Sequence, residues 1–262
     1  MVAGLALALK AIATAGTVVL ASTIAERTRP AIAAMILALP VSAGPGYLLL
    51  ALQHDAAFLA SASLAGLPVN ISTAVLVVIY AAFARRGMDV VPALAVGGVV
   101  WLAVTLLLHL LPPTLFAAAL ALAITYPVIL WATWSWRRGP PHQTVARRWY
   151  DVPVRACLVA TIVVTIVSLS DWIGPVATGS ALLFPTTYFS FMLLMHRRLG
   201  GGLVASAMIQ SLFMLIGFIG GMLALYICSS RDHLTLGLVL LFLIPVIYAL
   251  SVLMWMGWRA RA

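Results

Sequence analysis

Residues 12–40 run IATAGTVVLASTIAERTRPAIAAMILALP, and residues 157–185 run CLVATIVVTIVSLSDWIGPVATGSALLFP. The second stretch lies 145 residues after the first, and an ungapped shift by that length aligns prolines and same-sign charges. The coinciding pairs are Lys10 with Arg155, Glu26 with Asp171, Pro30 with Pro175, Pro40 with Pro185, and Ala60-Ser61-Ala62 with Ala205-Ser206-Ala207. Apolar matches are common in such a chain, but these pairs at one fixed spacing indicate an internal duplication.

The composition places this duplication in a membrane. The 262-residue chain is 64% hydrophobic and 8% charged, with a mean hydropathy of +1.15, whereas soluble domains carry about 25% charged residues. Apolar runs long enough to cross a bilayer recur, and they are continuous rather than alternating, which excludes a β-barrel. We therefore expect an all-α integral membrane protein whose surroundings are the lipid bilayer.

The apolar runs predict nine transmembrane helices. Their expected bounds are 3–25, 31–53, 56–84, 89–111, 114–136, 153–170, 173–195, 202–228 and 234–257. The first run carries Ala21-Ser22-Thr23 near its end, and small residues near the end are a feature of signal peptides, but its first nine residues are apolar rather than basic. Its counterpart in the duplication, 153–170, is internal, so we expect 3–25 to be a retained helix.

The arginines predict the orientation. With the N-terminus outside and the C-terminus inside, 13 of the 15 lysine and arginine residues fall at cytoplasmic ends and loops, leaving only Lys10 and Arg231 elsewhere. The net charge of +9 is then a topology signal, with some contact to anionic lipid. Nucleic-acid binding is not expected, because the chain has no basic, aromatic-laced soluble domain.

Topology and duplication together predict an inverted repeat. Residues 1–111 form a first four-helix repeat, 112–145 a linking helix and cytoplasmic loop, and 146–262 a second four-helix repeat. A single helix between the two repeats turns the second one upside down, which gives a 4+1+4 arrangement. Inverted-topology repeats are typical of secondary transporters, with the substrate site near the midplane between the repeats.

Matched interruptions mark the expected site. The second span is broken in Leu39-Pro40-Val41-Ser42-Ala43-Gly44-Pro45-Gly46-Tyr47, and its counterpart in Phe184-Pro185-Thr186-Thr187-Tyr188. Proline frees a carbonyl one turn earlier, and a freed group within the bilayer must face protein or a cavity. The substrate-binding candidates here are Pro40, Ser42, Tyr47, Pro185, Thr186, Thr187 and Tyr188; the alternative is that both prolines only kink their helices.

Three further polar residues within spans are candidates. Lys10 follows several apolar residues, so it either binds an anionic group or extends its amine to the interface. Asn70 and Gln210 lie inside the third and eighth spans, where an amide either contacts cargo or bonds a neighbouring helix. Glu26 and Asp171 end their spans and are better explained as solvated carboxylates, which leaves no obvious acid at the midplane.

Enzymatic chemistry is not expected. The chain has no nucleophile elbow, zinc-protease motif, phosphate-binding loop or Cys/His cluster, so no cofactor is expected. Its five histidines are scattered over both faces and do not form a metal site. Cys157 and Cys228 should lie near opposite faces, too far apart for a disulfide.

Leu9-Lys10-Ala11, Glu26-Arg27-Thr28-Arg29 and a second span broken at Pro40 resemble the start of the GlpM-type family. These are small bacterial inner-membrane proteins of four predicted spans, with a Leu-Lys-Ala opening and a Phe-Pro-Thr break. The second repeat keeps that break as Phe184-Pro185-Thr186, whereas the first has Leu39-Pro40-Val41. The resemblance covers about 40 residues of each repeat. It implies a fused, inverted duplicate in the bacterial inner membrane, and it brings no substrate.

The sequence thus predicts a transporter-like protein that moves a small solute or a lipid-like molecule by alternating access around the two breaks. Two other functions remain open at this point. One is a channel with the breaks as its constriction. The other is a non-transporting assembly or regulatory subunit that holds a membrane-protein partner in its grooves.

Overall fold

The computed structural model describes residue 16, residues 43–137 and residues 151–259. Within these ranges the chain is helical throughout, with short turns and no strand. The helices are α3 (Ala43–Ala51), α4 (Ala56–Arg85), α5 (Val90–Leu108), α6 (Leu115–Ala132), the short 3₁₀ helix η1 (Trp134–Arg137), α7 (Asp151–Leu182), α8 (Thr186–Leu199), α9 (Gly201–Ser229) and α10 (Leu234–Arg259).

Six of these helices are long and apolar enough to cross a membrane: α4, α5, α6, α7, α9 and α10. Large apolar side chains point outward along the peripheral helices, among them Leu106 of α5, Phe116 and Ile124 of α6 and Leu250 of α10. Such a surface suits hydrocarbon rather than water. An α-helical membrane protein is therefore confirmed, whereas the count of nine spans is not, because the described residues contain six candidates.

The predicted bounds can be compared with the helices one by one. Spans 56–84, 89–111, 202–228 and 234–257 correspond to α4, α5, α9 and α10 within three residues at either end. Span 114–136 divides into α6 and η1. Span 3–25 and the part of span 31–53 before residue 43 lie outside the described residues.

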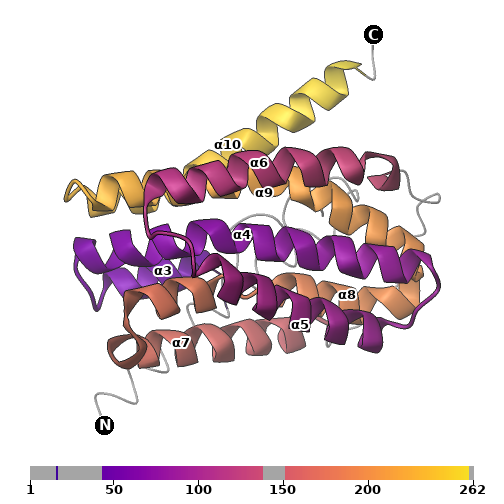
Figure 1. The fold of residues 1–262 in the computed structure, drawn as a ribbon, viewed down its shortest axis with the longest axis horizontal. Helices are drawn as coiled ribbons and strands as arrows, with labels where there is room; N and C mark the ends of the chain where they lie inside the picture. Colours follow the sequence, from indigo (N-terminus) through magenta and orange to yellow (C-terminus); the bar gives the residue numbers. More distant parts are fainter. Residues whose placement is uncertain (1–15, 17–42, 138–150, 260–262) are drawn as a thin grey trace.

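The predicted spans 153–170 and 173–195 differ most from the structure. Helix α7 runs through the boundary between them, with a kink at Gly174, whose φ is 75° and ψ 173°. A positive φ favours glycine, and the following Pro175 disfavours helical geometry at the residue before it. The chain turns back there (Figure 1), so the predicted seventh span consists of the last turns of α7 followed by α8.

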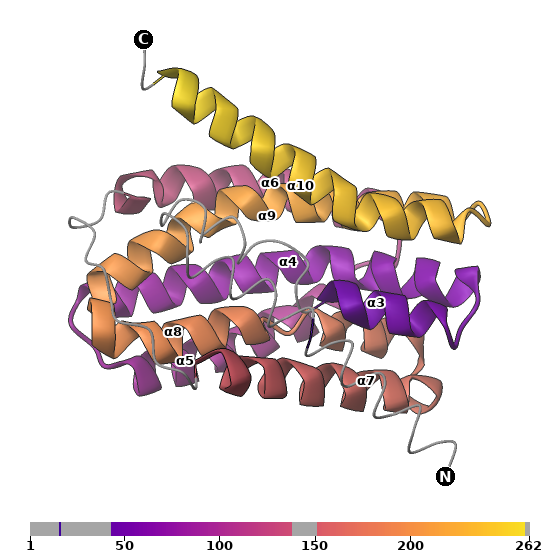
Figure 2. The same ribbon diagram turned by 180° about the vertical axis from the view of Figure 1, so that it is seen from behind.

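Helix α4 runs through the middle of the bundle, and α9 lies beside it in the opposite direction (Figures 1 and 2). Helix α5 packs on α4, and α10 packs on α9. Of the most apolar stretch of each helix, 67% is buried in α4 but 22% in α6 and α10. The pair α4 and α9 is thus the core, and α6 and α10 form part of its covering.

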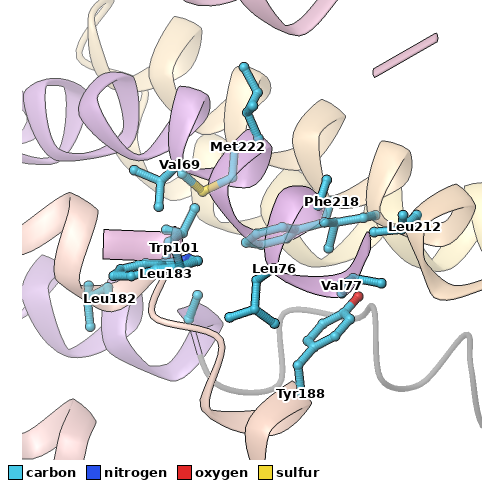
Figure 3. Packing of buried hydrophobic residues seen from close by; sticks show 14 of the residues in the cluster. Val69, Leu76, Val77, Trp101, Leu182, Leu183, Tyr188, Leu212, Phe218 and Met222 are labelled. Carbon is cyan, nitrogen blue, oxygen red and sulfur yellow. The ribbon is translucent and has the colours of Figure 1, made fainter. Parts of the chain in front are cut away.

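The core is a continuous set of apolar side chains from α4, α5, α7, α8 and α9 (Figure 3). Trp101 of α5 donates a hydrogen bond to the Thr73 hydroxyl of α4 at 3.3 Å, and its ring meets Phe184 edge-on. Tyr188 of α8 points its hydroxyl toward α4 beside Val77. The segment between α7 and α8 therefore packs into the core.

Charge is divided between the two ends of the bundle. One end, here called the basic end, carries Arg85, Arg86, Arg137, Arg197 and Arg198 together with Asp89. The opposite end, the acidic end, carries Asp55, Asp171, Arg231 and Asp232 at the helix turns.

Replacing Gly179 by alanine should destabilise the protein. A Cβ on Gly179 would overlap the carbonyl oxygen of Ala62 in α4, and a backbone neighbour cannot rotate away. Overpacking of this kind costs about 1–3 kcal/mol. The thermal midpoint of the detergent-solubilised variant should fall, while the control Gly202→Ala should not lower it, since nothing lies within 4 Å of that Cβ. Equal midpoints would contradict the close contact.

Candidate functional site

The candidate site lies where α7 ends and α8 begins. Leu183, Phe184 and Pro185 join the two helices, and Thr186 N–H donates to the Phe184 carbonyl at 2.7 Å. Pro185 occupies the N-cap position with φ −80° and ψ 57°, and no side chain caps the helix. The predicted break at Pro185 is therefore present. It lies within the bundle, because Thr186, Thr187 and Tyr188 are all buried.

A helix that begins inside a bundle leaves donors without partners. The Thr186 N–H bonds the Phe184 carbonyl, but the N–H groups of Thr187 and Tyr188 have no carbonyl partner among the described residues. Together with the helix dipole they form an electropositive patch that suits an acceptor or an anion. At the surface, water would satisfy these groups, but the first turn of α8 is nine-tenths or more buried.

Buried hydroxyls without partners lie at the same place. Thr187 Oγ1 and the Tyr188 hydroxyl have no hydrogen-bond partner in the part of the chain that the structure describes. Tyr126 of α6 also buries an unpaired hydroxyl, close enough to Tyr188 for the two phenols to interact electrostatically. The Ser211 hydroxyl of α9 donates to the Met208 carbonyl at 2.7 Å. Its oxygen lies beside the Tyr188 hydroxyl but outside hydrogen-bond geometry. We call Tyr126, Thr187, Tyr188 and Ser211 the hydroxyl cluster.

The tyrosines are the most informative members of this cluster. An unpaired buried hydroxyl costs about 1–3 kcal/mol. Ser72, Thr105 and Ser229 are unpaired as well, but a short hydroxyl on a helix can rotate toward the carbonyl of the preceding turn. A tyrosine hydroxyl is too far from its own backbone to do so, and Thr187 follows a break rather than a helical turn. These three hydroxyls need a partner from outside their own helix.

Other predicted residues are already paired. The Tyr47 hydroxyl of α3 donates to the Ala62 carbonyl at 3.3 Å, and the Asn70 amide donates to the Leu67 carbonyl at 3.0 Å. Tyr47 still borders the site, since Gly66 faces both its hydroxyl and Leu183. Gln210 donates to the Arg137 carbonyl at 3.0 Å and so joins α9 to η1 rather than to the hydroxyl cluster.

The remaining predicted residues cannot be placed. Lys10, Pro40 and Ser42 lie outside the described residues. The structure thus brings together Pro185, Thr186, Thr187 and Tyr188 by chain continuity, with Tyr47 on the border. It adds Tyr126 and Ser211, which were not among the substrate-binding predictions. Tyr126 had one signal in the sequence, a phenol in the middle of an apolar span directly before Pro127.

The basic end holds a second group of polar contacts. Arg197 donates to both carboxylate oxygens of Asp89, at 2.9 and 3.4 Å. That hydrogen bond, with one from the Val90 N–H, holds the pKa of Asp89 below its usual value. The Arg137 guanidinium lies 3.6 Å from the ring centroid of Phe213. Among the described residues no three His, Cys, Asp or Glu side chains gather as a metal site.

No family model, curated protein or solved structure matches this chain. Its function is therefore argued from the site.

Replacing Tyr188 by phenylalanine should leave the stability unchanged or raise it, because the variant buries one unpaired hydroxyl fewer. Tyr47→Phe is the matched control. It removes a hydrogen bond to Ala62 and should cost about 0.5–1.5 kcal/mol. Thermal unfolding in detergent measures both. If Tyr188→Phe lowers the midpoint as much as Tyr47→Phe does, the Tyr188 hydroxyl is paired and the cluster is scaffold.

Proposed function

We propose that the protein is a membrane transporter that moves a small solute or a lipid-like molecule by alternating access, with the hydroxyl cluster and the start of α8 as its cargo site. One observation carries the proposal. Thr187 and Tyr188 bury unpaired hydroxyls at an uncapped helix start inside a bundle of membrane-length helices. Discontinuous helices whose N-termini face the substrate are a recurring feature of transporter sites.

The arrangement of the helices supports an inverted repeat of 1–111 and 146–262. Helix α4 starts at Ala56 and α9 at Gly201, which is the 145-residue offset of the duplication. Helices α5 and α10 start at Val90 and Leu234, one residue short of that offset. The two helices of each pair, α4 with α9 and α5 with α10, run in opposite directions (Figure 1). The contacts between the repeats also correspond. Helix α5 of the first repeat packs on α8 of the second, and α10 of the second repeat packs on α3 of the first. Helix α6 and η1 lie in the linking segment 112–145.

The division of charge supports an orientation with the basic end in the cytoplasm, since arginine-rich ends stay inside. The C-terminus then lies inside and the N-terminus outside. A fused, inverted duplicate of a GlpM-type four-span unit in the bacterial inner membrane remains our proposal for the origin of the repeat, on the residues given above.

The site chemistry favours cargo with hydrogen-bond acceptors. Phenol and threonine hydroxyls donate, and so do the backbone N–H groups of Thr187 and Tyr188 at the start of α8. The surrounding side chains are apolar, among them Leu76, Val77 and Phe218 (Figure 3). A cargo with one polar group and an apolar body would satisfy both parts of the site.

Reporter fusions should place the segment around Gln143 in the cytoplasm and the His54-Asp55 turn outside. The arginines of the basic end fix this expectation through the positive-inside rule. Fusions in the Arg86-Gly87 and Arg231-Asp232 turns should report inside and outside respectively. An external signal at Gln143 would overturn both the orientation and the inverted repeat.

Thr187→Val should abolish or strongly weaken cargo binding while the protein stays folded. The change keeps the shape and removes a buried hydroxyl, and a cargo group left unpaired costs about 1–3 kcal/mol, or roughly five- to a hundredfold in affinity. Compounds that raise the thermal midpoint of the wild type identify cargo candidates. Their binding and their saturable uptake into proteoliposomes are then measured for each variant.

The matched control is Ser190→Ala, one turn further along α8. The Ser190 hydroxyl donates to the Thr187 carbonyl of its own helix and so is not free for cargo. This variant should bind and transport as the wild type does. Full activity in a folded Thr187→Val protein would reject the cargo site. Non-saturating flux would indicate a channel, and absence of flux with a co-purifying partner an assembly subunit.

A further inference from the structure

Four hydrogen-bonded pairs of side chains join residues 43–111 to residues 151–259, and they lie at the two ends of the bundle. Tyr80 with His196 and Asp89 with Arg197 are at the basic end. His54 with Ser170 and His109 with Ser180 are at the acidic end. Three of the four pairs contain a histidine, the side chain that titrates between about pH 5 and pH 8.

At the basic end, the geometry suits a neutral His196. The Tyr80 hydroxyl lies 2.7 Å from His196 Nδ1, and it has no other hydrogen-bond partner among the described residues. The phenol proton therefore goes to Nδ1, which must be unprotonated to accept it. A proton on Nδ1 would reverse this bond, leave the phenol proton without an acceptor among the described residues, and place a charge on a ring that is 8% exposed.

The charges around His196 add to this effect. Asp89 of the α4–α5 turn favours the protonated ring and Arg197 of α8 opposes it, but burial is the largest influence and lowers the pKa of His196. The hydrogen bond from Tyr80 needs the neutral form of His196, so the stabilisation that this bond gives to the closed basic end is fully present at high pH. It is lost as the pH falls toward the lowered pKa of His196.

At the acidic end, the hydrogen-bond geometry of His54 accommodates a protonated ring. Ser170 donates its proton to the Val167 carbonyl at 2.7 Å, so its oxygen accepts from His54 Nε2 at 2.7 Å. The other ring nitrogen, Nδ1, lies 3.8 Å from a carboxylate oxygen of Asp171. Asp55 adjoins His54 in its own turn, and Phe58 stacks on the ring at 3.7 Å. Protonated His54 keeps its bond to Ser170 and gains an ionic partner.

His109 should respond little to protonation. Its Nδ1 donates to the Thr105 carbonyl at 2.7 Å, and its Nε2 lies 3.0 Å from the Ser180 oxygen. A neutral ring accepts from Ser180. A protonated ring donates to Ser180, whose own proton then goes to the Val176 carbonyl at 2.9 Å. The contact persists in both states.

We propose that the proton is the coupling ion, bound at His196 to release the basic end and at His54 to hold the acidic end closed. The inference rests on the proposed transport function, and it explains how a transporter with no carboxylate among the described buried residues responds to protons. Protonation acts in opposite directions at the two ends. Acid therefore favours a form open at the basic end and closed at the acidic end, as alternating access requires.

Spin-label distances test this without a known cargo. In a background of Cys157→Ser and Cys228→Ser, Arg86→Cys with Leu193→Cys reports on the basic end, and Ala57→Cys with Trp172→Cys on the acidic end. All four positions are exposed. Between about pH 8 and about pH 5, the long-distance population at the basic end should rise several-fold. The pH midpoint of this rise should lie below the usual histidine pKa of about 6.5. The distance between the labels at the acidic end should not lengthen.

Variants separate the two histidines. His196→Asn places an amide oxygen near the position of Nδ1, still accepts from Tyr80 and cannot take up a charge, so the basic end should stay closed at low pH. Tyr80→Phe should open that end already at high pH. His54→Gln should let the acidic end lengthen in acid. His233→Gln, at the acidic end but in none of the four pairs, should respond as the wild type does.

The outcomes are distinct from those of the transport assay. A wild type whose distances ignore pH, or a folded His196→Asn protein that still opens in acid, overturns proton coupling even if uptake is saturable. An acidic end that opens in acid overturns the assignment of opposite effects. Failure to find saturable uptake rejects the transport proposal while the distance changes remain readable.

Discussion

The contact between Gly179 of α7 and Ala62 of α4 is the constraint on which the candidate site depends. Only a residue without a Cβ lets the two backbones approach so closely. The contact directs the last turns of α7 into the bundle after the reversal at Gly174. The chain then meets Pro185 within the core, and α8 begins there. A looser contact would allow the break to move outward, where lipid offers no partner for its freed backbone groups.

Polar groups in this core divide into two kinds. The Tyr47 and Thr73 hydrogen bonds join α3 and α5 to α4, and the Asn70 amide is paired within α4. Tyr126, Thr187 and Tyr188 are equally buried but unpaired. In a membrane protein a paired polar group is explained by packing. An unpaired polar group lowers the stability of the protein, and such a loss is tolerated where a bound ligand supplies the missing hydrogen bond.

The two ends of the bundle differ from its interior in how the helices contact one another. Among the described residues, the side-chain hydrogen bonds between 43–111 and 151–259 lie at the ends of the bundle and not around the break at Pro185. Along the core, the segments meet through apolar contacts such as those of α4 with α9. Apolar surfaces can slide or tilt at modest cost, whereas hydrogen-bonded pairs are made or broken. The bundle therefore has hydrogen-bonded pairs at both ends and an apolar interface between them.

The sequence by itself determined the helical membrane class, the bounds of α4, α5, α9 and α10 to within three residues, the 145-residue offset and the break at Pro185. These are properties of apolar run length, charge position and proline chemistry, which act locally along the chain. It did not determine which polar residues are free. In the sequence, Gln210, Asn70 and Thr187 were equivalent candidates. The packing of the helices decides that the Gln210 amide bonds the Arg137 carbonyl and the Asn70 amide bonds the Leu67 carbonyl of its own helix. Tyr126 and Ser211 join the cluster for the same reason, because they come from helices far apart in sequence. The pairing of Tyr80 with His196, 116 residues apart, was likewise hidden, since hydrogen-bond partners in a bundle are set by how helices pack and not by spacing along the chain.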